Sequence, residues 1–320
     1  MNLLSSMRYL MALHEHRHFG RAAQACHITQ PALSNAVRAL EAEFGVSIVR
    51  RGRSFAGLTP EGERVLRTAR RMVREHEMLQ QELDSEAGAP RGVLRIGAVP
   101  TAIPVASRFA AALQARMPGI SPVVRSMSSP AIEVDLEAFA LDLGLGYADR
   151  LGSMRFDVLP QYTERYYLLC PSDDGAPPSG AGLRIGPPMA WKDAAARPLC
   201  LMTSEMHSRT IVDSAFALAG AFAKPAMETD SVLTLMLAVH GGAVHSVLPG
   251  ALVAVLGTQA GLQAHPLVSP DVQTPVGLMA QSGSRASPVM DAALALARDP
   301  EWLQLAARFG GAGLAAGAHA

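Results

Sequence analysis

Apolar residues recur with helical spacing near the start of the chain. From Gln30 onward they return every three or four positions, which places them on one face of an amphipathic helix. Thr29 is a suitable N-cap for this helix and Gly45 a suitable end. The pattern therefore predicts a helix over residues 30–44. Its apolar stripe consists of Leu33, Val37, Leu40 and Phe44.

Two further helices are expected before this one, over Ser5–His16 and Arg21–Cys26, with a tight turn at 27–29. The polar face of the third helix is rich in groups that can read base edges. Amide side chains match adenine, arginine matches guanine, and a helix with such a face is typical of major-groove recognition. A solvated amphipathic helix pair is equally compatible with these residues alone. The polar face carries Gln30, Ser34, Asn35 and Arg38.

The next segment predicts a basic hairpin. Residues 47–49 form a short strand, residues 50–53 a turn, and residues 55–58 the returning strand. A basic hairpin tip beside a recognition helix is typical of a wing whose arginines hold phosphates or enter the minor groove. The arginines of this turn are Arg50, Arg51 and Arg53.

A long helix is predicted over residues 59–87, with Thr59 as its N-cap. Six positions repeat at alternating intervals of four and three, which is typical of the seam of a two-stranded coiled coil about 42 Å long. A single helix packed on its own domain is the alternative. The seam positions are Val65, Ala69, Met72, His76, Leu79 and Leu83.

Strands alternate with helices from residue 92 onward, so we expect a parallel sheet. Ligands of such sheets lie at the carboxyl ends of the strands, close to helix N-termini. Pro100-Thr101 follows the first strand and opens a helix, and Ser128-Ser129 holds the same place after the second strand. Hydroxyls and free backbone N–H groups at these positions predict an anion site.

The chain then enters a second lobe and returns, so two crossings define a hinged, two-lobed body. The expected divisions are 1–58 for the winged helix-turn-helix, 59–91 for the linker helix and hinge, 92–163 with 266–302 for lobe I, 164–265 for lobe II, and 303–320 for a C-terminal end with a disordered tail.

Charge is unevenly distributed although the formal net charge is zero. Residues 1–74 hold twelve Arg, no Lys and five Glu, a net charge of +7. A basic N-terminal module on a neutral body suits a polyanionic partner at one end only. Three scattered cysteines without a CxxC pair indicate reduced thiols and a cytoplasmic protein, and we expect neither a signal peptide nor a membrane span.

The first 62 residues closely resemble the LysR-type bacterial transcription regulators. The pattern residues are Thr29-Gln30-Pro31-Ala32-Leu33-Ser34, Leu40-Glu41, Gly45 and Leu58-Thr59-Pro60-Glu61-Gly62, in the family's order and spacing. The resemblance extends more loosely to residue 300, through Leu94-Arg95-Ile96-Gly97 and Leu248-Pro249. It implies an α/β effector domain similar to periplasmic binding proteins. Two departures from the pattern keep an apolar side chain: Cys26 replaces the usual Leu, and Ile48-Val49 replaces the usual Leu-Phe.

The resemblance also implies functional residues and partners. It adds Pro31 to the DNA-contacting set and assigns effector contacts to Pro100, Thr101, Ser128, Ser129, Met202, Thr203 and Ser204. His240 and His245 stand where the family has other residues. Each either faces the cleft or is an ordinary core or surface histidine whose hydrogen bonds are made elsewhere. The implied partners are an operator with dyad symmetry, a small anionic metabolite such as a carboxylate, RNA polymerase, and further copies of the chain in a dimer of dimers.

The stretch His16–Asn35 further resembles a subgroup found beside formate dehydrogenase or one-carbon genes, which would make formate or a similar small acid the effector. No catalytic or nucleotide-binding motif is present in the sequence. We therefore expect a regulator that is not an enzyme and uses no metal or cofactor. The alternatives are a solute-binding or enzymatic α/β domain tethered to DNA, and a DNA-binding protein that responds to no effector.

Overall fold

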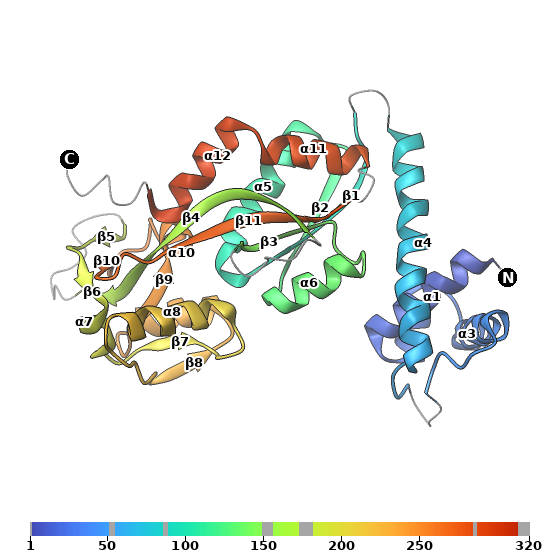
Figure 1. Ribbon diagram of the computed structural model, residues 1–320, viewed down its shortest axis with the longest axis horizontal. Helices are drawn as coiled ribbons and strands as arrows, with labels where there is room; N and C mark the ends of the chain where they lie inside the picture. The colour runs from blue at the N-terminus through green and yellow to red at the C-terminus, as the bar shows by residue number, and fades with distance from the viewer. Residues whose placement is uncertain are drawn as a thin grey trace. The chain divides into compact units, whose positions relative to one another are not determined.

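The computed structural model describes residues 2–50, 55–85, 89–148, 156–172, 182–283 and 287–312 (Figure 1). It divides into two compact units, one of Met1–Gly88 with Glu137–Ala140, and one of Ala89–Leu136 with Leu141–Ala320. Each unit has its own hydrophobic core, and each is described by itself. No helix in these described ranges is both long and apolar enough to cross a membrane.

The N-terminal unit contains four helices: α1 (Leu3–His16), α2 (Phe19–Ala25), α3 (Gln30–Phe44) and α4 (Pro60–Asp84). Helix α2 begins two residues before the predicted start because the His18 ring caps it, with Nδ1 accepting from the backbone N–H groups of Gly20 and Arg21. The packing of α1, α3 and α4 buries one apolar cluster, which includes Met7, Leu10, Leu40, Ile48, Leu66 and Val73.

Helix α3 begins and ends as predicted. The Thr29 hydroxyl accepts from the Ala32 N–H, and Gly45 adopts the left-handed conformation that closes the helix. The apolar stripe is buried except at its last member. Phe44 is 41% exposed, since it lies in the final turn, beyond the part of the helix that the core covers.

The predicted wing begins as a minimal antiparallel pair. Val49 and Leu58 form a β-bridge, and the Arg50 N–H donates to the Gly57 carbonyl over 3.0 Å. Glu41 ties α3 to this pair because its Oε1 accepts from the backbone N–H groups of Ile48 and Val49 at 2.8 and 3.2 Å. The tip of the hairpin, residues 51–54, lies outside the described residues.

Thr59 caps α4, as predicted, through a 2.9 Å bond from the Gly62 N–H to its hydroxyl. A side chain at Gly62 would collide with the Ile48 carbonyl, so this close approach requires glycine. The helix has 25 residues, which corresponds to about 38 Å rather than the expected 42 Å.

The second unit is built on a mixed sheet. Lobe I holds strands β1 (Gly92–Ala98), β2 (Ile120–Ser126), β3 (Leu143–Tyr147) and β11 (Gln273–Gln281). Strand β1 pairs in parallel with β2 and β3, as predicted, but β11 runs antiparallel to β3. The sheet is therefore not wholly parallel, because the chain re-enters lobe I directly from a strand of lobe II.

Helices cover both faces of the lobe I sheet (Figure 1). They are η1 (Pro100–Ala102) with α5 (Ile103–Arg116), α6 (Ser129–Glu137), α11 (Pro288–Ala297), α12 (Pro300–Ala307) and η3 (Arg308–Ala312). Side chains at Gly97 and Gly144 would collide with their surroundings, which include Ile132 of α6, so the glycines let this helix lie close to the sheet. Residues 303–312 are helical, with Ala306 and Gly310 buried, whereas a C-terminal end and disordered tail were expected from 303, and residues 313–320 lie outside the described part.

Strand β4 (Phe156–Pro171) makes the first crossing between the lobes. Its first part pairs with β11 of lobe I, and its last residues pair with β9 and β10 of lobe II. The crossing expected at residue 164 therefore lies inside one continuous strand. The elements of lobe II are β5 (Arg184–Ile185), β6 (Met189–Ala190), α7 (Trp191–Ala195), β7 (Cys200–Met202), α8 (His207–Leu218), β8 (Met227–Thr229), α9 (Val232–His240), β9 (Ser246–Pro249), α10 (Gly250–Val255) and β10 (Leu262–Val268).

Candidate functional site

The polar face of α3 lies on the surface of the N-terminal unit. Gln30, Pro31, Asn35 and Arg38 are exposed and Ser34 is half-buried, while the opposite face of the helix packs into the core. A rigid helix with amide, hydroxyl and guanidinium groups on its solvent side has the chemistry for reading base edges in the major groove. The fold thus leaves every predicted α3 residue accessible.

Only one of the predicted wing arginines lies in the described part of the chain. Arg50 is exposed, and its Nε donates to the Leu58 carbonyl over 2.9 Å, which fixes the side chain against the returning segment. Arg51 and Arg53 fall on residues 51–54, outside the described residues.

The predicted seam of α4 divides into two parts. Ala69 is fully buried in the core of its own unit, so the N-terminal part packs within the domain, as does the half-buried Val65. His76 is half-buried and its Nδ1 lies 3.3 Å from a guanidinium nitrogen of Arg8 on α1. The remaining seam residues are Met72, Leu79 and Leu83, exposed at 40%, 53% and 76%.

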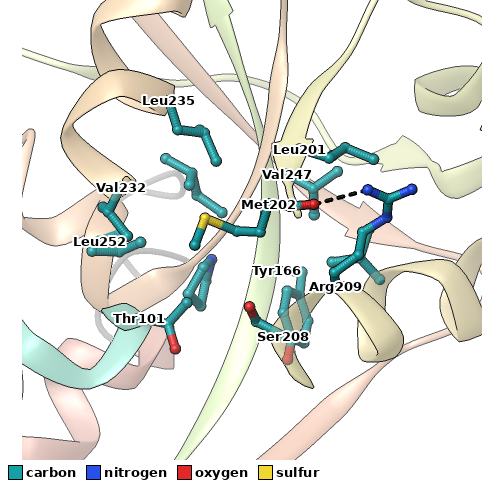
Figure 2. A pocket seen from close by; sticks show the side chains of 13 residues that line it. Thr101, Tyr166, Leu201, Met202, Ser208, Arg209, Val232, Leu235, Val247 and Leu252 are labelled. Carbon is teal, nitrogen blue, oxygen red and sulfur yellow. Dashed lines mark hydrogen bonds between the residues drawn. The ribbon is translucent and has the colours of Figure 1, made fainter. Parts of the chain in front are cut away.

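A pocket opens in the second unit beside the strand that joins its lobes. Its cavity volume is about 20 Å³, little more than one or two water molecules require. The walls are mainly aliphatic and polar groups occupy a few positions (Figure 2). The lining residues are Thr101, Tyr166, Leu201, Met202, Ser208, Arg209, Val212, Val232, Leu235, Val247, Leu248, Pro249 and Leu252.

Three helices begin at this pocket. Thr101 lies in η1, which leads directly into α5, and Ser208 and Arg209 are the second and third residues of α8. Val232 is the first residue of α9. Backbone N–H groups in the first turn of a helix are unpaired within that helix and carry a partial positive charge. Some of these groups are already paired, since the Arg209 N–H donates to the Met206 carbonyl and Ser231 caps α9, but the positive ends of helices beside the pocket still favour a negatively charged ligand.

Arg209 supplies the only guanidinium among the lining residues. Its NH1 donates to the Met202 carbonyl over 2.8 Å (Figure 2), and its side chain pairs with Asp213 and Glu228. Burial lowers the pKa of Arg209, but the two carboxylates raise it by more, so the group stays charged. Arg209 was not among the residues predicted from the sequence. The one sequence signal for its ion pair is the spacing of four residues between Arg209 and Asp213 on one helix.

Tyr147 of β3 connects two hydroxyls of the pocket wall. Its hydroxyl lies 2.7 Å from Thr101 Oγ1, and it is also hydrogen-bonded to the Ser208 side chain. Its ring centroid is 5.3 Å from that of His207. Since Thr101 and Tyr147 belong to lobe I and residues 207–208 to lobe II, this tyrosine joins the lobes at the pocket. Burial, followed by the nearby Glu164 and Tyr166, raises its pKa well above the usual value, so it remains protonated.

Two of the predicted effector residues line this pocket, namely Thr101 and Met202. Pro100 precedes Thr101 in the same turn. Ser129 does not cap α6: it is already helical, and its buried hydroxyl has no hydrogen-bond partner among the described residues. The remaining predicted contacts are absent from the lining set; they are Ser128, Ser129, Thr203, Ser204, His240 and His245.

The two histidines lie apart from the pocket lining. His240 is exposed at the C-terminal end of α9. His245 is half-buried and forms an isolated parallel bridge with Leu199. Tyr166 and Ser208 were not predicted from the sequence either, because nothing in the spacing of β4 and α8 shows that their residues meet Thr101.

Comparison with known proteins gives two family matches. Residues 4–63 match the bacterial regulatory helix-turn-helix protein, lysR family, and residues 87–300 match the LysR substrate binding domain. A probable HTH-type transcriptional regulator, LrrA of Synechococcus elongatus, is 30% identical over 77% of this chain and 80% of its own length.

A second relative is the DNA-binding transcriptional dual regulator OxyR of Escherichia coli, 29% identical over 88% of this chain and 90% of its own. Among solved structures, full-length CbnR complexed with its target DNA covers 96% of this chain and 100% of its own, with a TM-score of 0.67 and 19% identity. At that identity the likeness shows the fold alone. It agrees with a helix-turn-helix unit followed by a two-lobed α/β unit.

Proposed function

The chain belongs to the LysR family of bacterial DNA-binding transcriptional regulators, and we propose that a small carboxylate bound in the interlobe pocket controls its binding to an operator. The observation that carries this proposal is that first-turn residues of η1, α8 and α9, with the charged Arg209 among them, line one pocket. Thr101 and Ser208 add hydroxyl donors, and the aliphatic walls suit the carbon part of an organic acid.

The small volume of the pocket supports a ligand-dependent change between closed and open arrangements of the two lobes. A cavity of about 20 Å³ admits only a ligand of a few atoms unless the lobes separate. Tyr147 joins the lobes through Thr101 and Ser208, so a ligand that engages those hydroxyls alters the balance between closed and open forms. Only a difference in affinity for the two forms can drive such a change.

On the DNA side, the polar face of α3 reads base edges through Gln30, Ser34, Asn35 and Arg38. The wing arginines contact the DNA backbone and position the protein on it. Two copies of α4 pair through its exposed apolar residues and present two recognition helices to an operator with dyad symmetry. Pairs assemble further into a dimer of dimers, through which ligand binding reorients the DNA-binding units. RNA polymerase is a further partner of this assembly.

A second response is suggested by the names of two relatives, a hydrogen peroxide-inducible genes activator of Escherichia coli and a probable one of Streptomyces viridosporus. The thiols of this chain do not support it. Cys170 and Cys200 are buried, and burial raises the pKa of the Cys200 and Cys26 thiols, which opposes formation of the reactive thiolate. We therefore favour a non-covalent ligand.

The test is a thermal-shift screen of the full-length protein with sodium formate, acetate and benzoate, and with sulfate and chloride. Formate is included because residues 16–35 resemble the subgroup found beside formate dehydrogenase genes. A ligand that binds the folded state raises the melting temperature by mass action. We expect a carboxylate to do so, and Ser208→Ala to reduce the shift.

Ser129→Ala is the matched control, since Ser129 is a buried serine at another helix start that does not line the pocket. A shift lost in Ser129→Ala and kept in Ser208→Ala would move the ligand to α6 and contradict the assignment of the pocket. No shift with any anion would favour a regulator without an anionic effector. Turnover of the acid would favour an enzymatic domain tethered to DNA.

A further inference from the structure

A buried carboxyl group lies near the pocket and has no role in the proposed contacts. Glu164 is in the middle of β4 and is 0% exposed. Its Oε1 accepts from the Tyr162 hydroxyl over 3.1 Å, and its Oε2 has no hydrogen-bond partner among the described residues. A buried carboxylate normally has a paired cation or several donors, and only one donor is present here.

The position of this carboxyl on β4 places it close to the pocket. Tyr162, Glu164 and Tyr166 are alternate residues of β4 and share one face of the strand. Tyr166 lines the pocket, and its hydroxyl lies 2.9 Å from that of Thr274, the residue opposite Glu164 on β11. The charge of Glu164 also acts on Tyr147, which bonds the pocket hydroxyls of Thr101 and Ser208.

The titratable groups around Glu164 are mostly neutral acids. On β4 and β3 they are Tyr162 and Tyr147, whose pKa values burial raises so that both carry no charge at neutral pH, and Tyr166, whose hydroxyl lies against Thr274. On α8 they are His207, beside Tyr147, and Arg209, which already pairs with two carboxylates. Helices α9 and α10 bring none except the exposed His240, and Arg308 on η3 is exposed. None of these described groups forms an ion pair with Glu164.

This environment favours the protonated acid. Burial raises the pKa of Glu164 to about 8, and the bond from Tyr162 lowers it by less. The group is therefore neutral at pH 7, and ionisation would place a negative charge in the same buried region as a ligand anion. In such a region two like charges repel strongly.

Resting on the proposed anion pocket, we propose that the pocket binds its anion only while the buried Glu164 holds a proton. When Glu164 is ionised in the free protein, one anion and one proton must enter the site together, so that two like charges are not placed in the same buried region. Affinity for the anion is then constant while Glu164 is protonated and falls by up to tenfold per pH unit once it ionises, from about pH 8 upward.

The experiment measures the dissociation constants of sodium formate and sodium acetate for the full-length protein at pH 6.5, 7.5, 8.5 and 9.5 and constant ionic strength. In the native protein we expect little change up to pH 7.5 and a loss of affinity of about tenfold or more by pH 9.5. Glu164→Gln keeps the shape and removes the titration, so its affinity should stay near the low-pH value throughout.

Tyr162→Phe provides a second variant, which keeps Glu164 and removes the hydrogen bond to its ionised form. It should move the onset of the affinity loss to higher pH. Constant affinity of the native protein from pH 6.5 to 9.5 would overturn the proton coupling and leave the pocket assignment standing. An equal loss in Glu164→Gln would do the same. Failure of both anions to bind at every pH would overturn the pocket assignment and the coupling together.

Discussion

The Tyr147 hydroxyl lies 2.7 Å from Thr101 Oγ1 in the buried region where the two lobes meet. The same hydroxyl is hydrogen-bonded to Ser208 of the other lobe. One phenol therefore holds two of the three hydroxyls that line the pocket, the third being that of Tyr166, which bonds Thr274. The three hydroxyl protons of Tyr147, Thr101 and Ser208 serve two internal bonds. One proton remains for donation to a bound anion, either from Thr101 or from Ser208.

Replacement of Tyr147 by Phe should weaken both the lobe contact and ligand binding. Two buried hydroxyls lose their common partner, so we expect the effector unit to lose about 1–3 kcal/mol of unfolding free energy. Chemical denaturation followed by circular dichroism measures this loss. Tyr162→Phe removes a hydroxyl bonded to Glu164 and should leave the Thr101 and Ser208 contacts intact. Equal melting shifts by an anion in native protein and Tyr147→Phe would contradict the role of Tyr147 at the pocket.

The pH dependence of stability should report the protonation of Glu164. The folded-state pKa of about 8 lies above the ordinary value of 4.5, so between these values the folded state holds a proton that the unfolded state has lost. Its contribution to stability is complete below about pH 4.5 and is lost as pH rises to about 8, by at most about 1.4 kcal/mol per pH unit.

Glu164→Gln removes this contribution, so the stability difference between variant and native protein should grow in favour of the variant from pH 5.5 to 8 and then level off. Denaturant titrations at pH 5.5, 6.5, 7.5 and 8.5 measure it. A difference that is the same at all four pH values would show that Glu164 does not titrate in this range.

Arg38→Ala should weaken specific DNA binding by about 1–3 kcal/mol, because it removes a guanidinium that reads a base. Glu43→Gln is the matched control, since Glu43 is exposed near the other end of α3 and turned away from Arg38. Binding isotherms on the operator and on random DNA measure both variants. Unchanged operator affinity in Arg38→Ala would contradict the assignment of α3 as the recognition helix.

Leu79→Ala combined with Leu83→Ala should weaken pairing of the chain, since both side chains are exposed on the apolar stripe of α4. Sedimentation velocity over a range of concentrations should show a shift toward monomer. Leu218→Ala is the control, because Leu218 is 76% exposed on α8, in the other unit. An unchanged association state in the double variant would show that α4 does not form the pairing surface.

Mild hydrogen peroxide should leave the buried thiols reduced. Cys170 and Cys200 are both buried, and burial raises the pKa of Cys200. Mass spectrometry after treatment of the folded protein measures oxidation at each cysteine. The denatured protein is the control in which all three thiols are accessible. Rapid oxidation of either buried cysteine in the folded protein would instead favour a peroxide response.

The sequence by itself determined the local elements and the family. Thr29 and Thr59 cap their helices and Gly45 ends α3 as predicted, because caps, breakers and apolar spacing act within a few residues. Thr101 was also found in this way, from its place between a strand and a helix. Contacts with residues 48–49 explain two residues of the LysR pattern. Glu41 accepts a hydrogen bond from the Ile48 N–H, and Gly62 lies against the Ile48 carbonyl.

Only the tertiary structure decided which distant residues meet. The pocket brings Thr101 together with Arg209, Ser208 and Tyr166, because β4 crosses between the lobes. Strand β11 runs antiparallel because the chain returns to lobe I from a strand of lobe II. The division of the α4 stripe was likewise fixed by packing, which buries Ala69 and leaves Leu83 exposed. Glu164 reads in the sequence as one charged residue of an apolar strand. Its burial beside Tyr162 depends on contacts across the fold, and these set its protonation.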